Sequence, residues 1–460
     1  MDVRTTAGRL LVGLASLAIV GGCAAGSTPS ASLTPSPSPA PVAPTASPSP
    51  SPLDTPSPAP SAPARPISDL AWQDIGTIPA PGNEIQSAAG FARGYVAVER
   101  GSSSVWFSAD GRTWREVELP FKVTNDEYGS PLEAGANAVT TNGTQVLVVG
   151  GYSHEPCRAP EGASTGGGPD CPLYPIAWVS DDGVTWESAD PGPMPPEPSG
   201  YDQGSEFVAA WPVPTGGWDA ALSFWEGESL TGRDLWHSSD GIQWTELEPA
   251  PAADLDSLLQ FPMVHAGAAD QAGRRVVWQV WFPGGAINAA TTLATSPDGL
   301  TWISVADVPG PGTDIRGGVA PDGVRSRWVL VGGSGIGEDY SSSVPTVWTS
   351  EDRVSWAAAA LPFVAGAGCA EDEEECGGGI VTSVVLAQAG YVAVAAGWWG
   401  AQPYDTWLSE DGLTWVELPP VAGPGASVGP GVVADGPAGV IGIGVGPTGS
   451  DEKAAVWQLR

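Results

Sequence analysis

Two kinds of strand pair alternate along the chain from about residue 67 onward. The first kind has a strand rich in Ala, Gly and Val, a short turn and a more apolar strand, as in ANAVTTNGTQVLVVGGY. In the second kind an apolar strand enters a polar turn and a further strand leaves it, as in AWVSDDGVTWESAD. Short apolar segments bounded by Gly, Asp and Asn predict antiparallel hairpins. Two hairpins per period make four antiparallel strands, which is one blade of a β-propeller.

The polar turn of the second hairpin recurs six times, in the pattern SxDGxTW or close to it. The copies SADGRTW, SDDGVTW, SSDGIQW, SPDGLTW, SEDRVSW and SEDGLTW end at Trp114, Trp186, Trp244, Trp302, Trp356 and Trp415. In each turn the Asp side chain can accept backbone N–H groups, and the following Gly supplies a positive φ at little steric cost. The fifth copy has Arg353 in place of Gly and Ser355 in place of Thr. We therefore expect a looser turn, or one of another type, in that copy.

The two ends of the chain fix the number of blades. The strand before the turn carries a large apolar residue at seven places: Trp106, Trp178, Trp236, Leu293, Trp348, Trp407 and Trp457. The strand after the turn also has seven members, marked by Trp72, Trp114, Trp186, Trp244, Trp302, Trp356 and Trp415. The chain thus begins with the last strand of a blade and ends one strand short of completing it. We predict an all-β, seven-bladed propeller of four-stranded antiparallel blades over residues 67–460, closed by pairing of the N- and C-terminal strands.

The repeated turn resembles the Asp-box, or BNR, repeat of sialidases, sortilin-type receptor ectodomains and photosystem assembly propellers, although the usual form has one more residue between Asp and Gly. In that family the repeat is a folding element between the two outer strands, and it faces away from the active or binding side. The resemblance implies a structural role for the aspartates of the motif: Asp110, Asp182, Asp240, Asp298, Asp352 and Asp411. Because the family spans enzymes, receptors and assembly factors, the resemblance does not select a function.

The first 22 residues predict a bacterial lipoprotein signal peptide. Arg4 and Arg9 precede an apolar run, LLVGLASLAIV, that is too short to span a bilayer as a helix. The following VGGC resembles a lipobox, which implies cleavage before Cys23 and a diacylglycerol on its sulfur. A secretory signal with an incidental cysteine is the alternative. Residues 23–66, almost only Ser, Pro, Ala and Thr, predict a disordered tether that holds the propeller on the extracytoplasmic face of the cell membrane.

Charge and cysteine spacing narrow the set of partners. The formal net charge of −34 excludes nucleic acid, because no basic stripe is present to displace phosphate counterions, and leaves cations, basic proteins and neutral glycans. The remaining cysteines form two close pairs, Cys157 with Cys171 and Cys369 with Cys376, for which we predict disulfides, with metal ligation as the alternative. We expect a monomer without a cofactor. Calcium at Glu371–Glu375 stays open, although that run lacks the pattern of a dedicated calcium loop.

The links between hairpins and between blades lie on one side of a propeller, here called the loop face, and the turns within hairpins lie on the other, the turn face. The longest segments, with both cysteine pairs, map to the loop face and predict a recognition surface; neutral drift is the alternative. Aromatic residues near the ends of second strands, together with one arginine, are the candidate ligand-binding residues. They are Tyr152, Trp225, Trp281, Trp398, Trp399 and Arg316. Packing between blades explains the aromatic residues equally well.

Two functions follow from these features. The first is a non-enzymatic module that binds a protein, peptide or glycan at the cell envelope, and the second is a sialidase-like or other glycoside hydrolase. Sialidases use three arginines, a tyrosine paired with a glutamate, an aspartate and an early Arg-Ile-Pro segment, which this sequence lacks. The arginines expected at the loop face are Arg100, Arg158, Arg233 and Arg316. Their convergence around a Tyr and a Glu would favour the enzyme; we favour the binding module.

Overall fold

The computed structural model describes residues 69–80, 85–121, 132–154, 173–189, 203–226, 229–247, 264–281, 290–305, 308–310, 312–336, 343–362, 379–397, 405–421, 429–445 and 453–460. These residues belong to one compact unit, Pro63–Arg460. Several predictions fall outside the described residues: the lipobox Cys23, the four paired cysteines, the Glu371–Glu375 run, Trp398 and Trp399.

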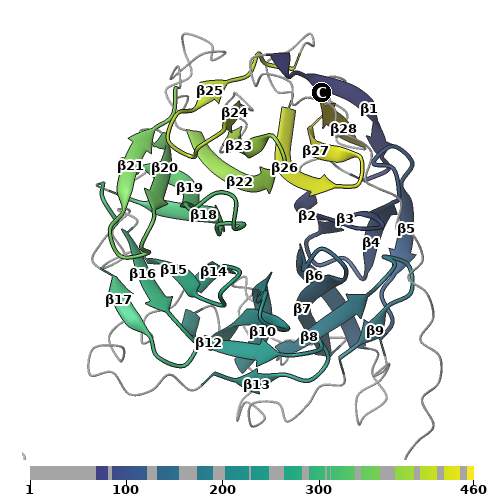
Figure 1. Cartoon of the computed structure of the whole chain (residues 1–460). Helices are drawn as coiled ribbons and strands as arrows, with labels where there is room; N and C mark the ends of the chain where they lie inside the picture. The colour runs from purple at the N-terminus through teal and green to yellow at the C-terminus, as the bar shows by residue number, and fades with distance from the viewer. Residues whose placement is uncertain are drawn as a thin grey trace, which may run out of the picture. The chain divides into compact units, whose positions relative to one another are not determined.

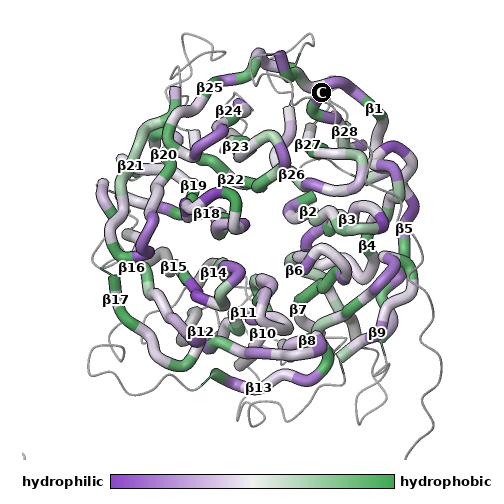
Figure 2. Tube along the Cα trace, viewed as in Figure 1, coloured by the Kyte–Doolittle hydropathy of each residue, from purple (hydrophilic) through white to green (hydrophobic). Residues whose placement is uncertain are grey.

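Seven four-stranded antiparallel sheets form a closed ring of blades around a central channel (Figure 1). In six blades the strands follow chain order from the channel outward, and the seventh has the order β26-β27-β28-β1. The predicted all-β, seven-bladed propeller is therefore confirmed. Hydrophobic positions follow the strands inside the blades, whereas hydrophilic ones gather at the turns and on outer strands such as β5 (Figure 2).

The innermost and second strands make the first hairpin of each blade. The innermost strands are β2 (Ile85–Phe91), β6 (Leu132–Thr141), β10 (Gln203–Pro212), β14 (Val264–Ala269), β18 (Asp314–Val319), β22 (Gly379–Ala387) and β26 (Gly429–Gly436). The second strands are β3 (Gly94–Glu99), β7 (Val146–His154), β11 (Trp218–Glu226), β15 (Arg275–Trp281), β19 (Trp328–Ser334), β23 (Gly390–Gly397) and β27 (Gly439–Val445).

The third and fourth strands make the outer pair of each blade, and the repeated SxDGxTW turn joins them in six blades, whereas the seventh pair comes from the two ends of the chain. The third strands are β4 (Ser104–Ser108), β8 (Leu173–Ser180), β12 (Ser229–Ser238), β16 (Ala290–Ser296), β20 (Val344–Ser350), β24 (Thr406–Ser409) and β28 (Ala454–Leu459). The fourth strands are β5 (Arg115–Glu118), β9 (Glu187–Ser188), β13 (Thr245–Glu246), β17 (Ile303–Val305), β21 (Ala357–Ala360), β25 (Val416–Glu417) and β1 (Trp72–Ile78).

Pairing of β1 with β28 closes the ring, as the matched tryptophan counts predicted. Trp72 lies opposite Leu459, and backbone hydrogen bonds between Ala71 and Arg460 in both directions, 2.8 and 3.1 Å long, extend the pairing. The indole Nε1 of Trp72 also donates to Thr406 Oγ1 in the preceding blade, at 2.9 Å. Closure therefore satisfies strand edges at both chain ends and ties the last blade to its neighbour.

Tryptophans of the third strands pack the blades against each other. Trp178, Trp348 and Trp407 are fully buried. Each indole N–H donates to a proline carbonyl at the end of the previous outer hairpin: Pro120, Pro309 and Pro362, at 2.8, 2.9 and 2.8 Å. These buried donors are paired across a blade boundary, so the same residue supplies apolar area and fixes the position of the neighbouring blade.

All six copies of the repeated turn have the same hydrogen bonds. The Asp Oδ1 accepts the backbone N–H groups two and three residues later, over 2.7 to 2.9 Å. These bonds hold the pKa of Asp110, Asp182 and Asp411 below its ordinary value. The motif glycines have φ between +74° and +82°, as the sequence predicted. Each of these carboxylates is therefore engaged by its own turn.

The expectation of a looser or different fifth turn was wrong. Arg353 adopts φ +71°, close to the values of the motif glycines, and its N–H donates to Ser350 Oγ at 2.8 Å, as the equivalent glycine does in four other copies. Its guanidinium Nη1 donates to Thr295 Oγ1 at 2.9 Å and to the Ser296 carbonyl at 3.2 Å in the preceding blade. Contacts between blades thus hold a non-glycine residue in a conformation that it rarely adopts.

Candidate functional site in the central channel

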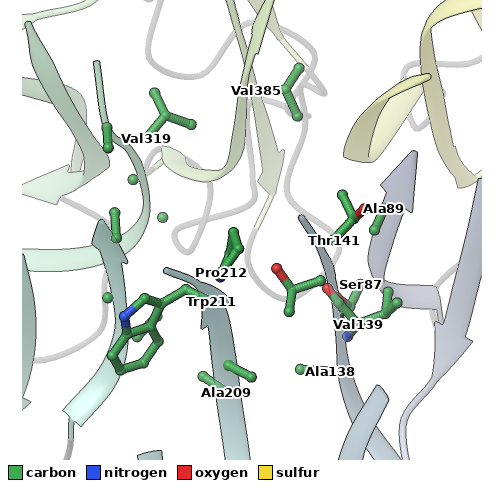
Figure 3. A pocket seen from close by; sticks show the side chains of 18 of the residues that line it. Ser87, Ala89, Ala138, Val139, Thr141, Ala209, Trp211, Pro212, Val319 and Val385 are labelled. Atoms are coloured by element: carbon green, nitrogen blue, oxygen red, sulfur yellow. Dashed lines mark hydrogen bonds between the residues drawn. The ribbon is translucent and has the colours of Figure 1, made fainter. Parts of the chain in front are cut away.

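The innermost strands enclose a cavity of about 990 Å³ on the axis of the propeller. Its lining comes from the C-terminal halves of these strands and from the turns that follow them, such as Thr141–Thr144 and Pro212–Gly217. Side chains from several blades face this space in Figure 3. The described lining therefore reaches the turn face, whereas the long loops that the sequence singled out lie outside the described residues.

Small residues keep the channel open because bulky ones pack behind it. The wall of β14 is Ala266, Gly267, Ala268 and Ala269. A Cβ on Gly267 would lie 2.6 Å from the ring of Trp211, which is 3% exposed and fills the space between two blades. Gly318 is constrained in the same way by Leu330 and Trp278, at 2.4 and 2.9 Å. The glycines thus leave room for large side chains between the blades, and they add no side chain that would narrow the channel.

Every innermost strand carries a β-bulge at the equivalent place in its pairing with the second strand. The ladder skips one residue between Ile85 and Ser87 in the first blade, and likewise in the other six. The extra residues, here called the bulge ring, are Gln86, Asn137, Val208, His265, Arg316, Thr382 and Gly431. A bulge re-aims its side chain out of the regular alternation of a strand. Five ring members line the cavity: Gln86, Asn137, Val208, Arg316 and Thr382.

The polar members of the bulge ring are held in defined positions. Asn137 Nδ2 donates to Glu206 Oε2 at 2.8 Å and to the Phe207 carbonyl at 3.0 Å, both in the next blade. Thr382 Oγ1 donates to the Gly431 carbonyl at 2.8 Å, again in the next blade. Gln86, in contrast, is exposed to the channel. The bulge ring thus combines side chains that are hydrogen-bonded to the next blade with the Gln86 side chain, which is exposed to the channel.

Charges in the cavity nearly balance. Its charged lining residues within the described chain are Arg316, Asp322 and Asp435. Arg316 Nη2 pairs with Asp314 Oδ2 at 2.5 Å, and burial raises the pKa of that fully buried Asp314 while the guanidinium opposes the rise. Asp322 pairs with Arg325 at 3.2 Å. Burial also raises the pKa of Asp435. Among the described lining residues, Asp435 is therefore the one charged side chain without an ion-pair partner.

The structure places the predicted ligand-binding residues in different surroundings. Arg316 lines the cavity. Tyr152 is 6% exposed, and its ring lies 5.1 Å from that of Tyr174, stacked, and 5.2 Å from that of Phe121. Its faces thus contact the protein's own aromatic residues, as the packing alternative expects. Trp225 and Trp281 lie at the ends of β11 and β15, where the sequence placed them, but their side chains are outside the described part.

The arginine cluster that would favour a sialidase-like enzyme can be followed only in part. Arg100 is exposed and is not among the described lining residues, Arg158 lies outside the described ranges, and the side chain of Arg233 is not described. Within the described lining, Arg316 has neither a Tyr nor a Glu beside it in the cavity. Among all described residues of the chain, no group of three His, Cys, Asp or Glu side chains could hold a metal. No helix among them is long and apolar enough to cross a membrane.

Sequence reasoning missed the bulge ring, although a signal was present. Aligned on their small residues, the innermost strands read IQSAAGF, ANAVTT, FVAAWP, VHAGAA, IRGGVA, VTSVVLA and PGVVADG. The second column of this alignment is the bulge position, and it varies from Gln to Gly while its neighbours stay small or apolar. A single polar residue near the start of an Ala- and Gly-rich strand was the available clue.

No protein-family model matches this chain, and a sequence search finds no characterised protein that does. Solved structures of other propellers resemble it. A streptogramin B lyase aligns with a TM-score of 0.48 at 9% identity, over 85% of this chain and 98% of the lyase. Virginiamycin B lyase from Staphylococcus aureus gives 0.45 at 9% identity, over 85% and 99%. Trypanosoma rangeli sialidase gives 0.42 at 13% identity, over 85% and 59%. At these identities the likeness concerns the fold alone.

Proposed function

We propose that the protein is a recognition module that binds a protein, peptide or glycan at the cell envelope without converting it. The observation that carries this proposal is the bulge ring: seven equivalent strands carry seven different residues at one position, and five of them, among them Gln86, Asn137 and Arg316, line one cavity. A scaffold that repeats its framework while varying one channel position is suited to reading the shape and hydrogen-bonding pattern of a ligand.

The anchoring of this module is part of the same proposal. The VGGC segment and the Pro- and Ser-rich stretch of residues 23–66 would hold the propeller on the extracytoplasmic face of a bacterial membrane, through a diacylglycerol on Cys23. Metabolic labelling with a fatty acid should mark the native chain and leave a Cys23→Ala variant unlabelled. Equal labelling of both proteins would refute the anchor and leave the recognition proposal in place.

A glycoside hydrolase is the competing function. In the described cavity, Asp322 and Asp435 are its carboxyl pair, and their pKa values shift in opposite directions. Burial acts to raise the pKa of Asp322, but the N–H groups of Arg325 and Val324 together lower it. Both Asp322 oxygens are engaged, Oδ1 by these N–H groups and Oδ2 by the Arg325 guanidinium. A carboxylate held by its own turn is poorly placed to attack a sugar, so we favour binding.

The test is a comparison of binding with turnover. The full-length protein in mild detergent is incubated with a panel of fluorogenic glycosides, sialosides included, with and without calcium. We expect no release of fluorophore above that of the heat-unfolded protein. Turnover that copurifies with the protein, and that an Asp435→Asn variant abolishes, would replace the recognition proposal with the hydrolase.

A further inference from the structure

The geometry points to a neutral oligosaccharide, bound in the turn-face half of the channel, as the ligand of this propeller, and we propose it as such. The inference rests on the proposed recognition function and narrows it to one ligand class. Four properties of the cavity carry it: its hydrogen-bonding groups, its charge balance, its lack of open aromatic faces and its broken strand edges.

The hydrogen-bonding groups of the cavity are mostly uncharged and are both donors and acceptors. Gln86 presents a primary amide to the channel, and the neighbouring Asn137 uses its Nδ2 toward the next blade, so that its Oδ1 can accept from a ligand. Thr140, Thr141 and Thr144 add hydroxyl groups to the wall of the same blade. Those of Thr141 and Thr144 already donate within their own turn, to the Gln145 carbonyl and to Asn142 Oδ1, so they can only accept from a ligand. Sugar hydroxyls donate and accept in the same way, so this lining matches a polyol better than a purely apolar molecule.

Charge disfavours anionic ligands in this space. The guanidinium of Arg316 is paired with the buried carboxylate of Asp314, and Asp322 is paired with Arg325. The chain as a whole has a net charge of −34, which repels anions over long distances. Asp435, whose pKa burial raises, has no ion-pair partner among the described residues, so an anion would meet a carboxyl group and no unpaired cation in this lining. A neutral ligand is not repelled in this way.

Within the described part of the lining, aromatic residues offer no open face for a flat apolar ligand. Trp211 and Trp278 contribute to the lining but are 3% and 1% exposed, so their rings pack between blades and do not form a stacking platform. Most of the other described lining residues are Ala, Gly, Ser and Val. At about 990 Å³ the cavity lies at the upper end of the ~300–1,000 Å³ range of small-molecule sites, which suits a sugar of a few units.

The bulges argue against the main competing ligand, an extended peptide. The innermost strands turn their free edges toward the channel, and a peptide could in principle pair with such an edge. A bulge breaks the regular spacing of N–H and C=O groups and twists the strand, which protects an edge from pairing. All seven edges carry a bulge at the same level of the channel. Strand addition is therefore blocked around the whole ring, whereas a sugar needs no strand edge.

The experiment measures binding to the full-length protein in detergent by calorimetry. The probes are soluble oligomers of glucose, mannose, xylose and N-acetylglucosamine, and a library of random uncharged heptapeptides. We expect one sugar series to bind, with a dissociation constant that changes less than about twofold between low and high salt, as for a neutral ligand. Gln86→Ala should weaken binding about three- to tenfold, the effect of one hydrogen bond. Gln243→Ala, an exposed glutamine in an outer turn, should leave it unchanged.

Each other result has a distinct meaning. Peptides that bind the native protein and bind the Gln86→Ala variant more weakly, with no sugar binding, would overturn the sugar inference and leave the recognition function. A sugar that binds equally well to the native and Gln86→Ala proteins would remove the ligand from the channel and overturn the inference. A sugar that is bound and then cleaved would keep the ligand class and overturn the non-enzymatic function. Failure of both probe classes to bind the native protein would overturn both proposals.

Discussion

Arg353 provides a direct test of how contacts between blades hold a strained turn. It is the one described non-glycine residue with positive φ, at +71°, and it occupies the glycine position of the fifth repeat. Holding a side chain there costs about 1 kcal/mol or somewhat more. Its Nη1 donates two hydrogen bonds to the preceding blade, at 2.9 and 3.2 Å, which together contribute about 1–3 kcal/mol. The two effects oppose each other in the native protein.

Two substitutions separate these effects. Arg353→Ala removes the hydrogen bonds and keeps a Cβ at positive φ, so we expect it to lower the free energy of unfolding by about 1–3 kcal/mol. Arg353→Gly removes the same bonds but relieves the backbone, so it should be about 1 kcal/mol more stable than the alanine variant and still less stable than the native protein. Urea denaturation followed by tryptophan fluorescence measures all three proteins.

Gly412→Ala is the matched control for backbone strain. Gly412 has φ +77° in the sixth copy, and a Cβ there would lie 3.1 Å from Val329 Cγ2, a contact that needs a small shift. We expect a loss of about 1 kcal/mol or slightly more. If this variant is destabilised while Arg353→Ala and Arg353→Gly unfold at the same urea concentration, the turn at Arg353 is not strained. Hydrogen bonds to the preceding blade would then have no strain to offset in the fifth repeat, and the balance of the two effects would be refuted.

Three further outcomes are expected. Arg275→Met leaves Asp219, 1% exposed, without its guanidinium partner and should cost about 3 kcal/mol in urea denaturation, whereas Arg327→Met, at the surface pair with Glu351, should cost under about 1. Burial, aided by Glu417, raises the pKa of Asp405 from 3.8 to about 6, so stability should fall by up to about 3 kcal/mol as pH rises from 4 through 6. Asp405→Asn should flatten that thermal-unfolding profile. Deleting residues 1–78 removes β1 and should lower the melting temperature and cause self-association in light scattering through the exposed edge of β28.

The architecture could be predicted because each turn depends on a few adjacent residues, whereas the number of blades follows from counting matched strands along the whole chain. Each SxDGxTW turn needs only a few adjacent residues, and the structure shows the same Asp and Gly geometry at every copy. The seven pre-turn residues and seven post-turn tryptophans predicted ring closure, because a strand that lacks partners at one end of the chain must find them at the other. Trp72 and Leu459 indeed lie side by side.

Contacts between neighbouring blades could not be predicted in the same way. The guanidinium of Arg275 pairs with Asp219 of the preceding blade, and that carboxylate also lies 2.8 Å from His237 Nδ1. Nothing in the spacing of these residues marks them as partners, because Asp219 in β11 and His237 in β12 meet Arg275 in β15 only when the two blades pack together. The fifth turn shows the same limit: its local sequence indicated a different conformation, and the hydrogen bonds of Arg353 to the preceding blade overrode it.

The strongest reason to place the function in the channel is a buried ion pair, which costs free energy and which the propeller fold does not require. Asp314 is fully buried beside Arg316, and burying such a pair is expensive even when the two charges meet. The equivalent position, two residues before the bulge, is Gly135 in β6, Ile380 in β22 and Gly429 in β26, and these blades pack without a charge there. Arg316 itself lies at a bulge position and lines the cavity. The buried Asp314 fixes the orientation of Arg316, and this orientation matters more than the pair's contribution to stability. We infer that the orientation serves a ligand in the channel.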